Sequence, residues 1–367
     1  MKILILNKHP HDVVGGSEIQ CDFIARGLLR RGHDVVYGAL AGQQSRYEVP
    51  YDCSPLPARN PAALRELLER VRPDLVYWRH NLKGFLGSAR EISRLGSALV
   101  FAVSHESDVQ RFPKRARLKK PFEVFRHFVN YHGHRFVDGV ASQNAELLGC
   151  VPAPRQAHLR NLMTDRCEPF SWPRDYVVWV SNLKPRKKPE RFVELAQRLQ
   201  SRAPGLDFLI VGAIQNRAYE SLRDPNERPG NLHYLGLRPL EEVNGILAGS
   251  RLLAHTCDPE GFPNVFVQAW LQEKPTVSLS FDPDGVIERE GLGSLCGTMD
   301  LFVDRVEELA LDPGACEVIG KRARQYAVAH HAVEQNIVGV ERFFADVLHS
   351  RLVAAGKEAA TDLRPEP

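Results

Sequence analysis

Hydrophobic and polar positions alternate on two length scales along the chain. Short apolar runs are separated by longer stretches in which apolar residues recur every three to four positions. The runs are "ILIL" (3–6), "DVVYGA" (34–39), "DLVYW" (74–78), "ALVFAV" (98–103), "YVVWVS" (176–181), "DFLIVG" (207–212), "LHYLG" (232–236), "RLLAHT" (251–256) and "TVSLS" (276–280). Near-continuous apolar runs are typical of parallel strands covered on both faces. Their alternation with helix-length stretches predicts a doubly wound α/β architecture.

The helix-length stretches and one proline-rich interruption predict the domain organisation. The stretches are 17–31, 188–201, 239–248, 299–310 and a long final pattern at about 314–352. The segment "RCEPFSWPRD" (166–175) holds two prolines among polar residues, which favours a linker. We therefore predict one Rossmann-like domain over 1–165 and another over 176–332. Residues 333–355 are expected to form a helix that crosses back to the first domain, and the polar tail 356–367 is expected to be disordered.

Composition places the chain among soluble globular proteins. Of its 367 residues 43% are hydrophobic and 25% charged, with a formal net charge of +3, an excess too small to argue for nucleic acid. Seven scattered cysteines without a C-x-x-C pair are typical of reduced thiols in a cytosolic protein. The apolar start is too short for a signal peptide, and no run approaches the ~18 apolar residues of a spanning helix. We therefore expect a cytoplasmic protein, with contact at a membrane surface left open.

Two loops that follow predicted strands are candidate anion sites. After the first strand, Gly15 and Gly16 allow a tight turn, and Ser17 with Gln20 is typical of a capping box at a helix start. The positive end of a helix dipole favours a phosphate there. The loop "VSNLKPRKKPE" (180–190) crowds four cations that could neutralise a diphosphate: Lys184, Arg186, Lys187 and Lys188. The plain alternatives are an ordinary glycine turn and a solvated basic turn.

A third loop places an acid before a helix and an amide within it. In "DPEGFPNVFVQAW" (258–270), Glu260 lies in a glycine-proline turn, Pro263 suits the first helical position, and Gln268 follows eight positions after the acid. At 1.5 Å per residue the two side chains are offset by roughly 7–8 Å along the axis, a spacing that suits two parts of one elongated ligand. Taken alone, the pattern equally describes a loop acid and an exposed helix glutamine.

The stretch "HTCDPEGFPNVFVQAWLQEKPTVSLS" resembles the Glu-x7-Glu motif of retaining GT-B glycosyltransferases, the large family 4-like, group 1 set that includes sucrose, glycogen and phosphatidylinositol-mannose synthesising enzymes. "ILNKHPHDVVGGSE" resembles the glycine-rich donor loop of that family, "AVSHES" (102–107) its strand-end histidine, and "VSNLKPRKKPE" its basic loop. The order of these pieces is specific, and the likeness covers nearly the whole chain. It implies the GT-B fold, in which two Rossmann-like domains face each other across a cleft.

The resemblance implies a role for each matching residue. Glu260 would bind hydroxyls of the donor sugar, His105 would touch the transferred sugar, and Lys187 would hold the diphosphate. These three are the predicted catalytic residues. The remaining predicted donor-binding residues are Gly15, Gly16, Asn182, Arg186, Gly261, Phe262, Asn264, Val265 and Gln268.

Two positions depart from the family pattern. Gln268 replaces the usual second Glu, which binds ribose hydroxyls; an amide accepts through one atom and donates through the other. On hydroxyl chemistry alone, Gln268→Glu should be tolerated. Asn182 stands where many relatives have Arg, so one cation near the diphosphate is missing, and Arg186 is the candidate to supply it.

The implied reaction is retaining transfer of a sugar from a nucleoside diphosphate, with uridine expected, to a glycan or lipid-linked acceptor in envelope or exopolysaccharide synthesis. Fixed cations and amides stabilise the leaving diphosphate, so neither a metal nor another cofactor is expected. Two alternatives stay open. One is a GT-B sugar-nucleotide epimerase, which needs acid/base carboxylates; the other is a non-catalytic sugar-nucleotide-binding protein.

Other patterns weigh less. "RFPKRARLKKPFEVFRH" (111–127) interleaves seven Lys/Arg with aromatic residues, which indicates a solvated basic helix or docking on anionic lipid, with nucleic acid disfavoured. "YHGH" (131–134) lacks partners at metal spacing. "DPD" (282–284) resembles a metal-binding triplet of another glycosyltransferase fold, but its proline favours a turn.

Overall fold

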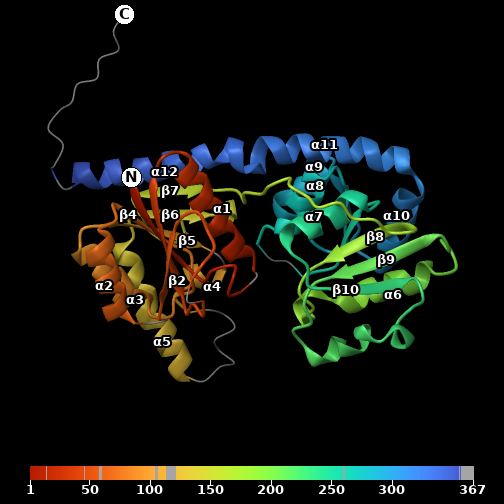
Figure 1. Cartoon of the computed structure of the whole chain (residues 1–367), viewed down its shortest axis with the longest axis horizontal. Helices are drawn as coiled ribbons and strands as arrows, with labels where there is room; N and C mark the ends of the chain where they lie inside the picture. The colour runs from red at the N-terminus through yellow and green to blue at the C-terminus, as the bar shows by residue number, and fades with distance from the viewer. Residues whose placement is uncertain are drawn as a thin grey trace, which may run out of the picture. The chain divides into compact units, whose positions relative to one another are not determined.

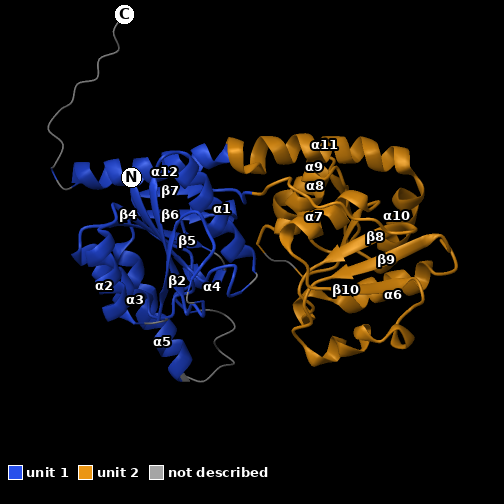
Figure 2. Cartoon of the chain, in the orientation of Figure 1, with its two compact units in different colours: residues 1–162, 336–367 blue, residues 163–335 orange. Residues whose placement is uncertain are grey.

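The computed structural model describes residues 1–13, 15–44, 46–57, 60–103, 106–112, 121–258, 261–354 and 356. The chain forms two compact units, residues 1–162 with 336–367 and residues 163–335 (Figures 1 and 2). Each unit has its own parallel sheet and its own hydrophobic core.

The first unit is built on a seven-stranded sheet in the order β3-β2-β1-β4-β5-β6-β7, with every pairing parallel. Its strands are β1 (Lys2–Asn7), β2 (Asp34–Leu40), β3 (Asp52–Leu56), β4 (Leu75–Trp78), β5 (Ala98–Val103), β6 (Gly139–Ser142) and β7 (Arg155–His158). The order reverses between β1 and β4, where Leu6 pairs with Trp78. In open α/β sheets such a reversal is where ligands bind, beyond the carboxyl ends of the strands.

Helices accompany this sheet, most of them with a buried apolar stripe. They are α1 (Gly16–Arg30), α2 (Pro61–Val71), α3 (Phe85–Arg94), α4 (Glu106–Val109), α5 (Pro121–Tyr131) and, from residue 336, α12 (Val333–Ala354). On α1 the residues Phe23, Ile24 and Leu28 are buried, as their spacing predicts. A side chain added at Gly27 would meet Ile337 of α12 at 2.7 Å, so glycine allows the two helices to approach closely.

The second unit has a six-stranded parallel sheet in the order β10-β9-β8-β11-β12-β13, which reverses between β8 and β11. The strands are β8 (Asp175–Val180), β9 (Leu206–Val211), β10 (Leu232–Gly236), β11 (Leu253–His255), β12 (Thr276–Ser278) and β13 (Gly293–Leu295). Its helices are α6 (Pro189–Leu199), α7 (Leu240–Gly249), α8 (Asn264–Leu271), α9 (Val286–Arg289), α10 (Met299–Leu311) and α11 (Pro313–His331).

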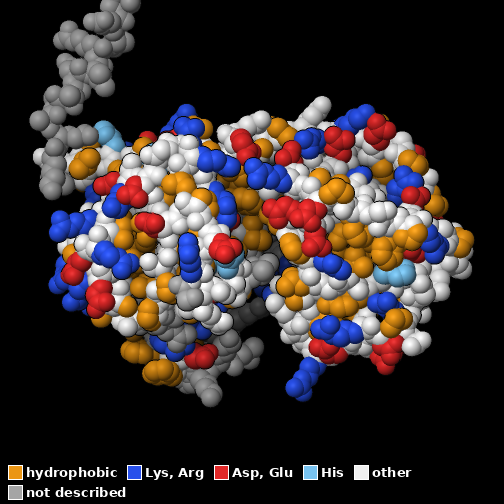
Figure 3. All heavy atoms as spheres, in the orientation of Figure 1, with side chains coloured by type: hydrophobic (Ala, Val, Ile, Leu, Met, Phe, Trp, Pro, Cys, Tyr) orange, Lys and Arg blue, Asp and Glu red, His pale blue; other side chains and the backbone are white. Residues whose placement is uncertain are grey.

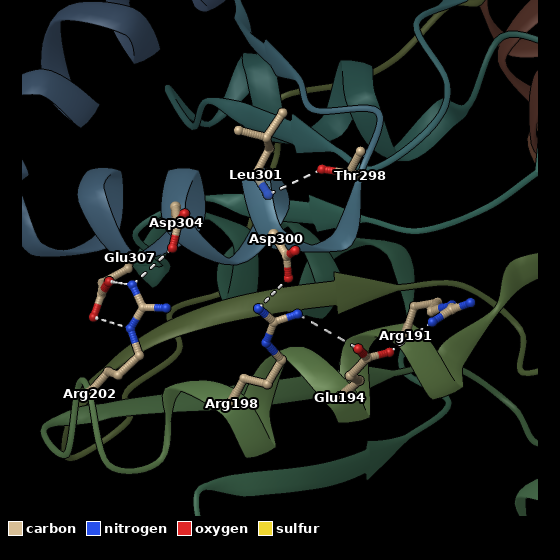
Figure 4. A network of polar contacts seen from close by, with 9 residues as sticks. All are labelled: Arg191, Glu194, Arg198, Arg202, Thr298, Asp300, Leu301, Asp304 and Glu307. Carbon is tan, nitrogen blue, oxygen red and sulfur yellow. Dashed lines mark hydrogen bonds and ion pairs between the residues drawn. The ribbon is translucent and has the colours of Figure 1, made fainter.

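Helices α6 and α10 lie side by side on one face of the second sheet. Phe192 and Leu195 of α6 share a buried cluster with Phe302 of α10. At the surface Arg198 pairs with Asp300 at 2.6 Å, and Arg202 pairs with Asp304 and Glu307 (Figure 4). Because exposed ion pairs contribute little, the buried cluster supplies most of the stability of this contact.

The long helical pattern predicted at 314–352 is broken in the structure. α11 ends at His331, Ala332 is extended (φ −60°, ψ 131°) and α12 begins at Val333. Ala332 forms a bridge with Met163, whose amide donates to the His331 carbonyl at 2.8 Å. This pairing of distant segments interrupts the helix, and no local periodicity reveals it.

Surface and composition features are ordinary. Acidic and basic side chains are interspersed over the face seen in Figure 3, in line with the small net charge. None of the seven cysteines, all of which lie within the described ranges, forms a disulfide. Over the described ranges no helix has the length and apolar character needed to cross a membrane.

Candidate functional site

The site in the second unit is built from two loops at the reversal of strand order. The loop 181–188 follows β8, and the loop 256–263 follows β11. Because β8 and β11 are adjacent and parallel, their carboxyl ends bring these loops together. This position holds most of the predicted donor-binding residues of the second unit.

The basic loop is anchored from beneath by Thr256. Its fully buried hydroxyl lies 3.0 Å from the carbonyl oxygens of both Lys187 and Lys188, and it accepts a hydrogen bond from Trp179 Nε1 at 2.9 Å. Lys188 itself has φ 47°, a left-handed conformation uncommon for a residue with a side chain. The threonine hydroxyl therefore holds the turn that presents Lys187.

Asp258 joins the two loops a second time. Its amide donates to the Arg186 carbonyl at 3.0 Å, and its carboxylate pairs with the Lys188 ammonium. Lys188 is thus partly neutralised within the protein. Of the four predicted cations, Lys187 is half-buried, whereas Lys184 and Arg186 are exposed. A half-buried ammonium interacts with an anion more strongly than an exposed one.

His255, at the end of β11, lies under this arrangement. It is 3% exposed, its Nδ1 lies 3.3 Å from Ser278 Oγ, and its ring packs against Phe266. Burial, with the nearby charge of Lys187, lowers the pKa of His255 to about 3. The imidazole is therefore neutral at physiological pH and does not compensate charge at the loop.

Helix α8 begins beside these loops without a capping side chain. Pro263 is the N-cap residue rather than the first helical residue, so the prediction was wrong by one position. Asn264 and Val265 form the first turn, which contains no acid, so the positive end of the dipole is not neutralised locally. Gly261 is exposed, while the Phe262 ring packs against His331 and Trp270.

Gln268 is buried rather than exposed on the helix surface. It is 6% exposed, and its Nε2 donates to Asn244 Oδ1 at 3.0 Å. Asn244, fully buried on α7, uses its own Nδ2 for the carbonyls of Thr164 at 3.3 Å and Arg166 at 2.7 Å. Asn244 can therefore offer only its oxygen to residue 268. Across the described residues Gln268 Oε1 has no protein partner, so it remains an acceptor for a ligand hydroxyl.

Asn182 contributes to loop structure. Its Oδ1 accepts from the Ala213 amide at 3.3 Å, next to the bridge between Leu183 and Ile214. The side chain at the position of the missing cation therefore connects the loops after β8 and β9. This is a structural reason for an amide at this position.

The glycine loop of the first unit differs in detail from its prediction. α1 begins at Gly16, and its N-cap residue is Gly15, so no side chain caps the helix. The predicted capping box of Ser17 and Gln20 was therefore wrong. Gln20 instead exchanges two hydrogen bonds, each 2.7 Å, with the backbone of Leu162. Ser17 donates to Glu18, whose carboxylate lies over Gly15.

Several predictions fall on residues outside the described ranges. They are Glu260, His105 and the part of the basic segment at 113–120. The triplet at 282–284 is a turn, as predicted: Asp282 accepts the amides of Ile287 at 2.8 Å and Glu288 at 3.1 Å. Through the described part of the chain, no three His, Cys, Asp or Glu side chains cluster as metal ligands.

Sequence reasoning missed Thr256, His255 and Asn244. The first two are the polar residues that end the predicted strand "RLLAHT" (251–256), so their position at a strand end was an available signal. Asn244 lies within a predicted helix and pairs with a residue 24 positions away. Local periodicity does not encode such a pairing.

Residues 174–312 match the family model described as "Glycosyl transferases group 1". The matched range runs from β8 to α10 and contains both site loops, α8 and the Asn244–Gln268 pair. The second unit therefore resembles the domain that this family model describes. No relative was found among curated protein sequences.

Solved structures resemble the chain over nearly its whole length. HepE from Anabaena in complex with UDP-glucose has a TM-score of 0.72 at 18% identity and covers 95% of this chain and 100% of its own. Sucrose-phosphate synthase from Thermosynechococcus elongatus has a TM-score of 0.74 at 13% identity, with the same coverage. WaaG, a glycosyltransferase involved in lipopolysaccharide biosynthesis, has a TM-score of 0.69 at 15% identity and covers 92% of this chain and 98% of its own.

These likenesses establish the fold. The chain has the GT-B fold with two Rossmann-like domains, as predicted. The resemblance to group 1 glycosyltransferases that the motifs carried is confirmed by the family model and the solved structures together.

Proposed function

We propose that this protein is a retaining glycosyltransferase that moves a sugar from a nucleoside diphosphate, with UDP as the carrier, to a glycan or lipid-linked acceptor. One observation carries the proposal. Thr256 and Asp258 fasten the lysine-bearing loop to the loop that precedes α8, at the strand-order reversal of the second unit. A half-buried lysine and an acid-free helix N-terminus are thereby fixed beside one another.

This arrangement suits the charge that develops during sugar transfer. As the bond between sugar and diphosphate breaks, negative charge grows on the leaving diphosphate, and fixed cations and amides stabilise it. Lys187 and the first turn of α8 supply these groups without a metal ion. Glu260 would bind hydroxyls of the donor sugar, His105 the transferred sugar, and Gln268 Oε1 the ribose.

The solved structures add support for the donor. HepE is described in complexes with UDP-glucose, with UDP, and with UDP and glucose. From these complexes we propose the uridine nucleotide as the carrier for this protein, and we leave the donor sugar open. The envelope or exopolysaccharide setting and a cytoplasmic location belong to the same proposal. Contact of residues 111–127 with an anionic membrane surface is also part of this proposal.

A direct test uses purified protein with a panel of UDP-sugars in buffer containing EDTA. We expect one donor to yield UDP, and an acceptor to increase the rate. NMR of the product should show the anomeric configuration of the donor. Glu260→Ala should reduce turnover about 10²–10³-fold while UDP still binds. Glu227→Ala, an exposed acid of the same unit, should behave as wild type.

The alternatives give different outcomes. A changed sugar still attached to its nucleotide would identify an epimerase. Donor binding without turnover of any donor or acceptor would identify a non-catalytic sugar-nucleotide-binding protein. Loss of activity in EDTA would contradict the metal-independent mechanism, and unchanged turnover in Glu260→Ala would remove the assignment of that acid.

A further inference from the structure

Two histidines of the first unit contact the chain segment that follows the predicted catalytic residue His105. Their ring nitrogens reach the main chain of α4 and of the residue directly after it. His134 Nε2 lies 2.9 Å from the carbonyl oxygen of Asp108, and His127 Nε2 lies 2.8 Å from that of Gln110. Because a carbonyl oxygen only accepts, both imidazoles carry a proton on Nε2 and donate it. Two N–H groups therefore hold this backbone at carbonyls that are two residues apart.

His134 is buried among aromatic rings. It is 4% exposed, and its ring centroid lies 5.4, 4.7 and 5.0 Å from those of Phe85, Phe101 and Tyr131. Its Nδ1 is buried and has no hydrogen-bond partner among the residues that the structure describes. Burial lowers the pKa of His134 to about 4, so the imidazole is neutral at physiological pH. A phenylalanine would fill this space without a buried unpaired nitrogen, so packing alone does not account for a histidine here. The imidazole adds an N–H directed at α4.

The elements that carry the two histidines have a firm support of their own. They are α5 and the adjoining 3₁₀-helix η2 (His132–Phe136), and α3 lies beside both (Figure 1). A side chain added at Gly133 would meet the Phe85 ring of α3 at 2.6 Å, so glycine allows η2 to lie directly on α3. Phe128 of α5 stacks on Phe112, with ring centroids 5.3 Å apart, which continues the contact beyond the two carbonyls. A support that is itself packed can hold a segment in one orientation.

We propose that His134 and His127 are positioning residues for sugar transfer, which hold the segment after His105 so that this histidine meets the transferred sugar. The proposal rests on the proposed function, because the role of His105 belongs to it. Val109 of α4 is buried in the core cluster and fixes the apolar side of the segment, whereas the two N–H donors fix the direction of its carbonyls. A misplacement of about 1 Å in a reacting group can cost about 10²-fold in rate, so a small rotation of this backbone matters.

Hydrogen–deuterium exchange of the full chain tests the positioning without any substrate. His134→Phe keeps the contacts with the surrounding rings but lacks the N–H. The amides of residues 106–112 should exchange severalfold faster in this variant than in the wild type, while those of β5 stay protected. His132→Phe is the matched control, because His132 lies in the same η2 but is exposed, and it should exchange as wild type. Equal exchange of 106–112 in the wild type and His134→Phe would overturn the positioning.

Steady-state kinetics tests the consequence for transfer. In His134→Phe, kcat should fall about tenfold, because the sugar-contacting segment is less well placed. The donor nucleotide is proposed to bind in the second unit, so KM for the donor and UDP affinity should each change less than about twofold. Circular dichroism at the assay temperature gives the folded fraction, and kcat is expressed per folded protein. A loss of kcat that only matches a loss of folded protein would overturn the role in transfer.

Two variants of His127 keep the test decisive if His134→Phe folds poorly, because His127 is only half-buried. His127→Gln can present an N–H at a similar reach, whereas His127→Leu has none. We expect the glutamine variant to keep most of the wild-type kcat and the leucine variant to lose severalfold. Equal kcat in His127→Leu and the wild type would overturn the role of this histidine. Equal losses in the two variants would overturn the role of its N–H.

The two proposals fail separately. If the wild type turns over no donor, the proposed function fails, and the exchange measurement still decides whether the histidines hold the segment. Faster exchange of 106–112 with unchanged kcat in His134→Phe would overturn the role in transfer and leave the proposed function intact.

Discussion

The amide of Gln268 is oriented by a second buried amide. The side-chain nitrogen of Asn244 donates to the carbonyls of Thr164 and Arg166, so only its side-chain oxygen is available to residue 268. A glutamine donates to that oxygen, whereas a glutamate would place a carboxylate against it. The second acid of the Glu-x7-Glu pattern is therefore incompatible with this asparagine in its present orientation.

This pairing reverses the expectation that Gln268→Glu is tolerated. We expect the substitution to lower the free energy of unfolding by about 1–3 kcal/mol, because a buried hydrogen bond is replaced by two facing acceptors. Urea denaturation measures it. Gln272→Glu is the matched control, because Gln272 directly follows the same helix and its amide donates to a backbone carbonyl, that of Asp165, at 3.0 Å. A stability cost in Gln268→Glu no larger than in Gln272→Glu would show that Asn244 reorients freely.

Lys187 is half-buried whereas Lys184 and Arg186 are exposed, and that difference predicts its kinetic role. Lys187→Ala should lower kcat as well as donor affinity, with kcat/KM reduced about 10²-fold, since the charge is needed most as the diphosphate leaves. Lys184→Ala, at an exposed position of the same loop, should change both by less than about threefold. Steady-state kinetics with the identified UDP-sugar decide this. A large loss in Lys184→Ala alone would mean that the loop is aligned wrongly with the family.

At the scale of single residues, the sequence predicted where the site loops lie but not the hydrogen bonds that hold them in place. Residue order identified 180–190 and 258–270 because both match contiguous family motifs. Thr256 and Asn244 act through partners that are distant in sequence. Burial and hydrogen-bond satisfaction decide those roles, and neither can be read from local spacing.

At the scale of elements, strong apolar runs were predicted well and weak strands were missed. All nine predicted runs contain strands. The four missed strands lack the apolar signal. β3 reads "DCSPL" with one buried residue, and β7 reads "RQAH" with three exposed residues. β6 is the small-residue segment "GVAS", and β13 lies inside the glycine-rich segment 291–297. Edge and small-residue strands are held by pairing with a neighbour rather than by their own hydrophobicity.

Helix α5 gives an element-scale prediction about membranes. Phe122 and Phe125, three positions apart on one face, are 71% and 63% exposed, and they follow the basic segment. Exposed aromatic residues beside clustered cations are typical of docking on anionic lipid. The double variant Phe122→Ser/Phe125→Ser should reduce binding to phosphatidylglycerol-containing vesicles at least about tenfold in a sedimentation assay.

A matched control separates insertion from general surface hydrophobicity. Leu301→Ser on α10 removes an exposed leucine, 57% exposed, from the other unit and should leave vesicle binding unchanged. The wild type and all variants should bind only weakly to neutral phosphatidylcholine vesicles. Equal binding of wild type and the double variant to anionic vesicles would leave α5 as a solvated helix.

At the scale of the whole molecule, strand–helix alternation predicted two doubly wound units, and the resemblance predicted the GT-B fold. What the pattern did not indicate is how the end of the chain is fastened to the first unit. Residues from 336 onward belong to that unit, although they follow the second unit in sequence. The contacts are specific: Arg351 pairs with Asp138 at 2.6 Å, and Phe344 packs against Tyr77.

Glu341 provides a pH-dependent part of this attachment. Its two carboxylate oxygens meet His33 Nε2 at 2.7 Å and Arg31 Nε at 2.6 Å. The hydrogen bond from His33, aided by Arg31 and opposed by burial, lowers the pKa of Glu341 below its ordinary value. Because the carboxyl binds its proton less readily when folded than when unfolded, its contribution is complete above the ordinary glutamate pKa. The contribution is lost as the pH falls through the lowered folded value.

Glu341→Gln should therefore lower the free energy of unfolding at pH 7 by about 0.5–1 kcal/mol, a modest cost because the carboxylate is partly exposed to solvent. The deficit relative to wild type should shrink as the pH is lowered through the acidic range and vanish once Glu341 is protonated. Urea unfolding between pH 7 and pH 3, followed by circular dichroism, measures the difference. Asp346→Asn, an exposed acid on the same helix, is the control and should show no such deficit. A deficit in Glu341→Gln that persists unchanged to the lowest pH would mean that side-chain shape, not charge, fastens α12 at this point.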